Sequence, residues 1–140
     1  MDGVLKSFAP HELSAYTVPD GVAVIGSGVF FNCSLLESVV LPEDVTVIEE
    51  SAFLDCMRLS SVTLPVGVTS IGEFAFISCP KLVELYCKPT NPPAVDLTAF
   101  DIFVCVPTSL QVYVPTASVD VYKAAYPWSE LAGQIMGYDF

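Results

Sequence analysis

The amino-acid sequence repeats itself every 23 residues, and this period constrains the fold more than any other feature. Prolines recur at Pro19, Pro42 and Pro65, and seven further positions keep the same spacing over three units. These positions are Val22, Val45 and Val68; Ile25, Ile48 and Ile71; Phe30, Phe53 and Phe76; Cys33, Cys56 and Cys79; Leu36, Leu59 and Leu82; Val39, Val62 and Leu85; and Leu41, Leu64 and Cys87. Such self-similarity is the signature of a solenoid.

One repeat contains the elements of one coil. The segment Leu59-Ser-Ser-Val62-Thr-Leu64 alternates as a strand with one buried face does, and Pro65 ends it. Val68 to Gly72 predicts a second, short extended stretch, and Glu73 to Phe76 predicts one helical turn that directs the Phe76 ring inward. No coil buries its apolar face without a neighbour, so the coils must stack.

The repeats become irregular towards both ends, which divides this single domain into four parts. Residues 1–14 form an expected N-terminal cap, in which Val4, Leu5, Phe8 and Leu13 cover the open end of the core. Residues 15–87 are the regular repeats, and residues 88–115 are an irregular last repeat whose strand is Val112 to Pro115.

Residues 116–140 are expected to form a helical cap, because terminal repeats need a polar outer surface. Thr116 is a suitable N-cap for a helix across Ala117 to Tyr126, with Val119, Tyr122 and Tyr126 on one side. Pro127 stops this helix, and residues 128–135 predict a second helical piece.

These motifs resemble a known family. Ile71-Gly72-x-x-Ala75-Phe76-x-x-Cys79 and Leu59-x-x-Val62-x-Leu64-Pro65 are similar to the 23-residue repeat of BspA-like (treponemal-type) leucine-rich repeat proteins, and Val114 to Ala125 resembles their closing segment. The resemblance implies a β-rich, right-handed solenoid with about four to five repeats. It also implies a bacterial cell-surface protein that binds other proteins, in the manner of an adhesin, and is not an enzyme.

Composition argues against two classes of partner. Sixteen Asp and Glu against five Lys and Arg give a formal net charge of −11. Binding to nucleic acid or to an anionic membrane needs clustered bases, and the five bases are scattered from Lys6 to Lys123.

Glycines interrupt the uncharged stretch 21–36 and prolines interrupt 102–119, so no membrane span is predicted. The start, Met1 to Lys6, lacks the features of a signal peptide, which predicts an intracellular chain or a piece of a longer one.

The cysteines pose the sharpest chemical alternative. Cys33, Cys56 and Cys79 are expected in adjacent coils, roughly 5 Å apart. Such a ladder runs in a line, whereas zinc needs thiolates that converge at about 2.3 Å, so we interpret these thiols as core packing. Cys87 takes a core strand position, and Cys105 falls in the irregular region.

Catalysis and metal binding find little support in the other residues. His11 is the single histidine, placed by phase beside the Cys33 position in the preceding coil, and a Cys–His nucleophile would still need an orienting group and an oxyanion pocket. The acidic pairs Glu43-Asp44 and Glu49-Glu50 lack an EF-hand-like pattern. We therefore predict no catalytic residue, no metal site and no cofactor.

The outward side of the strands is the more useful constellation. Where Leu59, Val62 and Leu64 point inward, the residues between them point outward, and stacking arranges them in two rows. One row is Ser38, Ser61, Glu84 and Gln111, and the other is Thr17, Val40, Thr63, Tyr86 and Tyr113. Tyrosines on a rigid sheet supply contact area at low entropic cost, although aromatic residues also favour exposed strands in general. The candidate binding residues are Tyr86, Tyr113, Thr63, Val40 and Glu84.

Two functions therefore stand as hypotheses. The first is a binding module for a protein or glycan, in which tyrosines anchor the partner and acids attract basic groups. The second is a structural spacer or self-assembly unit, a monomer or weak homo-oligomer that associates through the ends of its solenoid at Leu5, Phe8 or Leu13.

Overall fold

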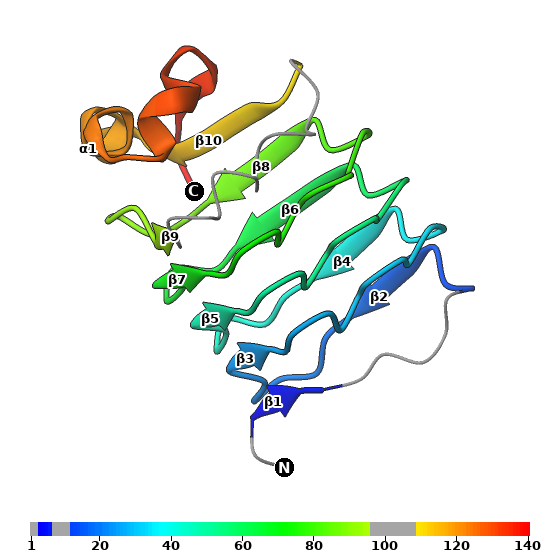
Figure 1. The fold of residues 1–140 in the computed structure, drawn as a ribbon. Coiled ribbons are helices and arrows are strands. Elements are labelled where there is room, and N and C mark those ends of the chain that lie inside the picture. The colour runs from blue at the N-terminus through cyan, green and yellow to red at the C-terminus, as the bar shows by residue number, and fades with distance from the viewer. Residues whose placement is uncertain (1–2, 7–11, 96–108) are drawn as a thin grey trace.

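The chain winds into a stack of coils with one parallel sheet along each of two sides (Figure 1). The computed structural model describes residues 3–6, 12–95 and 109–140. The first sheet has the order β1-β3-β5-β7-β9, formed by Val4–Leu5, Val24–Ile25, Val47–Ile48, Ser70–Ile71 and Ala94–Val95. The second has the order β11-β10-β8-β6-β4-β2, formed by Ile135–Tyr138, Gln111–Pro115, Glu84–Cys87, Ser61–Leu64, Ser38–Val40 and Ala15–Thr17.

Between β3 and β7 in the first sheet, and between β2 and β8 in the second, the 23-residue period becomes the register of the strands. Val47 pairs with Val24 and with Ser70, and Ser61 pairs with Ser38 and with Glu84. Each residue therefore lies beside its own counterpart in the next coil. The predicted leucine-rich-repeat solenoid is confirmed.

The core fills the inside of the coil with ladders of identical or similar side chains. Phe53 stacks between Phe30 and Phe76, with ring centroids 5.0 and 5.2 Å apart and nearly parallel planes. All three rings are buried, as the sequence predicted. Offset stacks of this kind add to the free energy gained by burying the rings.

The third side of the coil consists of turns, and the helical turn predicted for residues 73–76 is wrong. Phe74 and Ser78 have φ values of +57°, in the left-handed region, and their counterparts Ser51 and Asp55 have values of +57° and +62°. Two left-handed residues four apart break a helix. They also direct backbone groups towards the next coil, so that the Phe53 amide donates to the Ala75 carbonyl at 2.8 Å.

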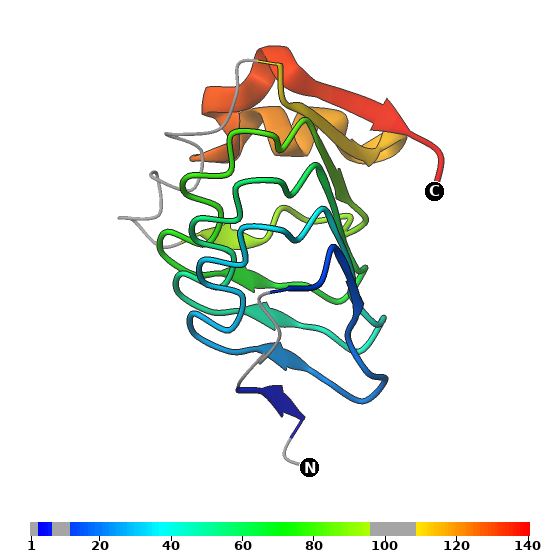
Figure 2. The same ribbon diagram turned by 90° about the vertical axis from the view of Figure 1, so that its right-hand side faces the viewer.

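A cap closes the C-terminal end of the stack (Figure 2). It contains a 3-10 helix at Thr116–Ser118, the helix α1 at Val119–Ala124, and a second 3-10 helix at Trp128–Gln134. Tyr122 and Trp128 are buried, with ring centroids 5.3 Å apart. The Tyr122 hydroxyl donates to the Pro89 carbonyl at 2.8 Å, and the Trp128 indole donates to the Pro93 carbonyl at 3.0 Å. The cap thus holds the proline-rich segment after β8.

The cap differs from the prediction at three places. Thr116 does not cap a helix, because its hydroxyl instead donates to Asp139 at 3.0 Å. Tyr126 lies after α1 and is 61% exposed, so it does not share the buried side of Tyr122. The chain also ends in a strand that the sequence did not reveal, β11, which pairs in parallel with β10.

The N-terminal end matches its prediction only in part. Val4 and Leu5 form β1, which pairs with β3, and Leu5 packs against the core. Leu13 is 39% exposed and is not part of the core, because it precedes β2 on the outside of the coil. Phe8 lies outside the described residues.

None of the helices in the described part of the chain has the length and apolar character needed to cross a membrane.

Replacing Phe53 tests the aromatic ladder. Phe53 is fully buried, so Phe53→Ala should lower the free energy of unfolding by about 3–5 kcal/mol, the usual cost of a large core truncation. Urea titration followed by circular dichroism measures this loss. Phe31→Ala is the matched control, because Phe31 is 48% exposed and its replacement should cost far less. A loss below about 1 kcal/mol for Phe53→Ala would show that the stacked Phe rings contribute little to the stability of the fold.

Candidate binding face

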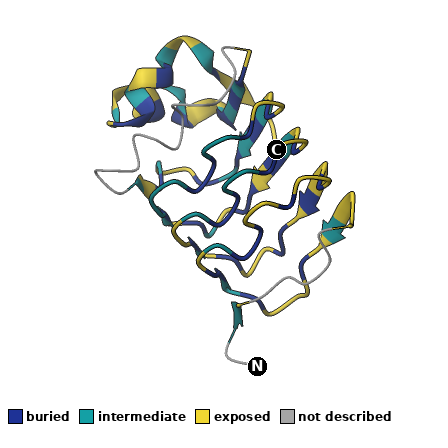
Figure 3. Ribbon diagram, turned by 45° about the vertical axis from the view of Figure 1, so that its right-hand side comes forward, coloured by how far each residue is buried: buried dark blue, intermediate teal, exposed yellow. Residues whose placement is uncertain are grey.

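The outward residues of the six-stranded sheet form the rows that the sequence predicted. Tyr86 pairs with Thr63 on one side and with Tyr113 on the other. On β4, Ser38 pairs with Ser61, so Val40 lies in the row of Thr63. Glu84 occupies the neighbouring row, between Ser61 and Gln111. Figure 3 shows buried and exposed residues alternating along these strands. The structure thus brings all five candidate residues onto one surface, which we call the binding face.

Four aromatic rings gather on this face where β8, β10 and β11 meet. Tyr86 and Tyr113 stack with centroids 4.8 Å apart. The Tyr138 ring is steeply inclined to both rings, in T-shaped contacts at 5.4 Å from Tyr86 and 5.7 Å from Tyr113. Phe140 lies 4.8 Å from Tyr138 and 6.4 Å from Tyr86. We call these four residues the aromatic cluster.

The sequence reasoning missed Tyr138 and Phe140 because it did not foresee β11. In β11, Met136 pairs with Tyr113 and Tyr138 with Pro115, so the outward rows continue for one more strand. The signal in the sequence was weak: the outward Met136 and Tyr138 flank a glycine, and only Ile135 is buried. Phe140, Tyr138 and Met136 are 50%, 43% and 49% exposed, which extends an apolar surface beyond the two predicted tyrosines.

A hydrogen bond joins the two rows of the binding face. The Tyr86 hydroxyl donates to Glu84 Oε2 at 2.8 Å. This bond to the carboxylate is the main reason that the pKa of Tyr86 is raised to about 12, since the ionised phenol would lose its role as donor and face a negative charge. The phenol therefore stays protonated to a higher pH than an ordinary tyrosine, and its hydrogen bond holds the Glu84 carboxylate beside the ring.

The binding face is uneven along the stack. Its N-terminal half carries short side chains, with Val40 58% exposed and Thr63 also exposed. Its C-terminal half carries the aromatic cluster. The surface thus has low relief over β4 and β6 and carries large rings over β8, β10 and β11.

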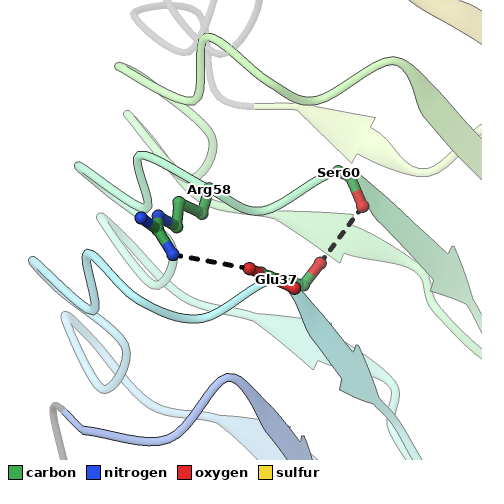
Figure 4. Close-up of polar contacts among 3 residues, drawn as sticks. All are labelled: Glu37, Arg58 and Ser60. Carbon is green, nitrogen blue, oxygen red and sulfur yellow. Dashed lines mark hydrogen bonds and ion pairs between the residues drawn. The ribbon is translucent and has the colours of Figure 1, made fainter.

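An open hollow of about 460 Å³ lies next to the N-terminal ends of these strands. Glu37, Arg58 and Ser60 line it together with Lys81 and Val83. Arg58 Nη1 is 3.6 Å from Glu37 Oε1, and the Ser60 hydroxyl donates to the Glu37 carbonyl at 3.2 Å (Figure 4). Both charged side chains are more than half exposed, so this ion pair contributes little to stability.

A second shallow hollow, of about 500 Å³, runs along the other sheet. Outward residues of three strands line it, namely Val47, Ser70 and Ala94, with Glu49 and Glu50 at one edge. Glu49 accepts a hydrogen bond from the Ser27 amide at 2.9 Å. The sequence reasoning did not identify this surface, because its outward residues are small and varied.

The cysteine ladder packs inside the coil. The Cys56 thiol donates to the Phe30 carbonyl and the Cys79 thiol to the Phe53 carbonyl, both at 3.2 Å. Cys33, Cys56, Cys79 and Cys87 are buried and carry free thiols, and burial raises their pKa values. A raised pKa suppresses the reactive thiolate, which agrees with a packing role.

Two of the other chemical candidates, His11 and Cys105, lie outside the described residues. Within residues 3–6, 12–95 and 109–140, no three His, Cys, Asp or Glu side chains converge in a way that would hold a metal ion.

Parallel strands joined coil by coil at a fixed period place the chain among the leucine-rich repeat solenoids. The family model of the BspA type leucine rich repeat region matches residues 5–105 in six copies. The chain therefore belongs to the BspA-type leucine-rich repeat family. The resemblance seen in the repeat motif is confirmed.

Two solved structures are similar to this chain. A leucine rich cell surface protein from Faecalibacterium prausnitzii shares 28% identity at a TM-score of 0.55, over 78% of this chain and 37% of its own. The pneumococcal vaccine antigen PcpA shares 20% identity at a TM-score of 0.60, over 89% of this chain and 34% of its own, which supports the fold alone. This chain thus spans little more than a third of either protein. No curated protein matches it.

Titration of the Tyr86 phenol tests the bond between the two rows. Glu84→Gln removes the negative charge, so the pKa of Tyr86 should fall from about 12 towards the ordinary value of about 10. Ring-carbon NMR shifts recorded against pH measure this change.

The native protein should also lose stability between about pH 10 and 12, because there the unfolded phenol releases its proton before the folded one does. This loss should shrink in Glu84→Gln. The control Glu50→Gln removes a charge from outside the binding face and should leave the pKa of Tyr86 unchanged. An unchanged pKa in Glu84→Gln would mean that the negative charge of Glu84 does not act on Tyr86 in solution.

Proposed function

We propose that this chain is a non-enzymatic binding module, adhesin-like and displayed at a cell surface, and that it captures a protein through its binding face. The observation that carries the proposal is the aromatic cluster, in which three rings from three strands and a fourth from just after β11 pack together on an outward surface. Tyrosine and other aromatic residues are enriched at interfaces because they supply large contact areas with few rotatable bonds.

The rigidity of the surface supports the same role. β8 and β10 are central strands, each paired on both sides, so the stacked Tyr86 and Tyr113 need little reorganisation on binding. A pre-formed surface loses less conformational entropy when its partner docks. The similarity to a cell surface protein of F. prausnitzii favours display outside the cell.

The titratable groups support a module without catalysis. The thiols of Cys56, Cys79 and Cys87 and the phenol of Tyr122 are buried in the core, and burial raises their pKa values. Their shifts follow from packing, whereas catalytic groups with shifted pKa values lie in clefts that substrate reaches.

Self-association through the solenoid ends is a second candidate. Within the described residues, β2 pairs with β4 on one side only, and the exposed Leu13 lies close to it in sequence. An edge strand is a template for another strand.

Capture by the binding face is measured on an array of purified extracellular-matrix proteins and glycans. The double variant Tyr86→Ala, Tyr113→Ala should lose at least about tenfold in affinity for a captured protein, because aromatic anchors dominate such interfaces. The control variant Phe31→Ala, Tyr126→Ala removes two exposed rings from outside the face and should bind like the native chain. Equal capture by all three proteins, each shown to be folded, would rule out this face.

Self-association has a separate readout. Sedimentation velocity over a range of concentrations should show a shift to larger species that Leu13→Glu abolishes, because a charge at the exposed edge opposes strand pairing. A single monomeric species at every concentration would remove this candidate.

A further inference from the structure

We propose that Glu84 and Tyr86 form a cation site that takes an arginine side chain from a basic segment of the partner protein. This inference rests on the proposed function and names the chemistry of its partner. It depends on three features of the binding face: an uncompensated carboxylate, an aromatic ring held beside it, and small neighbouring side chains.

Glu84 has no cationic partner within the described residues. The two ion pairs recorded there are Arg58 with Glu37, and Lys88 with Glu43. Glu84 accepts a hydrogen bond from the Tyr86 hydroxyl at Oε2, and no other described residue donates to its carboxylate. A half-buried carboxylate that is bound by one neutral donor gains further stabilisation from a cation.

The register places small side chains next to this pair. Glu84 and Tyr86 are successive outward residues of β8, and their neighbours on β6 are Ser61 and Thr63. Both neighbours are small, whereas Tyr113 stacks on Tyr86 from the side of β10. A cationic group lying over β6 would therefore have the Glu84 carboxylate and the Tyr86 ring as its neighbours.

Arginine suits this arrangement better than lysine does. The planar guanidinium stacks on aromatic rings and offers paired donors to a carboxylate, whereas the lysine ammonium is a strongly hydrated point charge. The guanidinium can place its plane against the ring of Tyr86 while its N–H groups reach Glu84.

The charge of the whole chain favours a basic partner as well. A net charge of −11 attracts cationic segments and accelerates their encounter with the protein. A neutral glycan would also stack on the aromatic cluster, but it would gain little from the full charge of Glu84. Charge selectivity therefore separates the two partners.

The experiment uses the whole chain and three short, acetylated and amidated peptides. The first alternates arginine with glycine, the second replaces each arginine by lysine, and the third replaces it by citrulline, which is similar in shape but neutral. Isothermal titration calorimetry at low and at physiological ionic strength measures each affinity. The arginine peptide should bind most tightly, the citrulline peptide at least about tenfold more weakly, and added salt should weaken arginine binding.

Three single variants locate the site. Glu84→Gln and Tyr86→Leu should each weaken arginine binding by roughly fivefold or more, because the first removes the charge and the second keeps apolar bulk but removes the ring. Glu50→Gln removes the same charge beside the other sheet and should leave the affinity within about twofold of the native value. Circular dichroism and thermal unfolding confirm that each variant is folded.

Two results would overturn the cation site. One is equal binding of the arginine and citrulline peptides, which would show that the positive charge of the peptide does not contribute to its affinity. The other is an equal loss in Glu50→Gln and Glu84→Gln, which would show diffuse attraction to an acidic protein. Either result leaves the proposed function standing if the array still finds a protein that depends on Tyr86 and Tyr113. Arginine binding that depends on Glu84 and Tyr86 supports the site, and failure of the array would then count against the proposed function alone.

Discussion

The stacking of each coil on a copy of itself is the constraint on which the rest of the structure depends. A fixed length of 23 residues lets the same position recur at the same place, so that Phe53 lies between Phe30 and Phe76 and Val47 lies between Val24 and Ser70. Backbone hydrogen bonds join neighbouring coils on all three sides, including the turns. An insertion or deletion within a strand would shift this register by one residue and turn core side chains outward.

The same constraint makes the two ends of the stack special. The last full coil would expose its core, and the cap covers it with Tyr122 and Trp128, whose polar atoms are satisfied by the carbonyls of Pro89 and Pro93. The cap then returns to the sheet as β11 and adds Met136 and Tyr138 to the outward rows. Closing the core and enlarging the binding face are thus achieved by one segment.

Most of the fold could be predicted because the positions that stay apolar in every repeat are the buried ones. Positions such as Val62 and Leu85 keep their apolar character in every coil, and their strands and register follow from the period. The turns were harder to predict, because Phe74 and Ser51 adopt left-handed φ values that their residue types do not favour. At Ser51 this conformation accompanies a hydrogen bond from its amide to the Glu73 carbonyl of the next coil, at 2.8 Å. The binding face was predicted as far as Tyr86, Tyr113 and Glu84, and incompletely beyond them.

The sequence by itself determined the solenoid, the period of its register, the inward ladders of Phe and Cys, and the two outward rows up to Tyr113. These features are local and repeat, so one coil explains the next. Only the tertiary structure decided that Tyr138 and Phe140 join Tyr86 and Tyr113, and that the Tyr86 hydroxyl meets Glu84. The first depends on how the cap folds back onto β10. The second depends on the side-chain conformations of Tyr86 and Glu84, two residues apart on β8. Neither contact repeats along the chain, so the period carries no information about them.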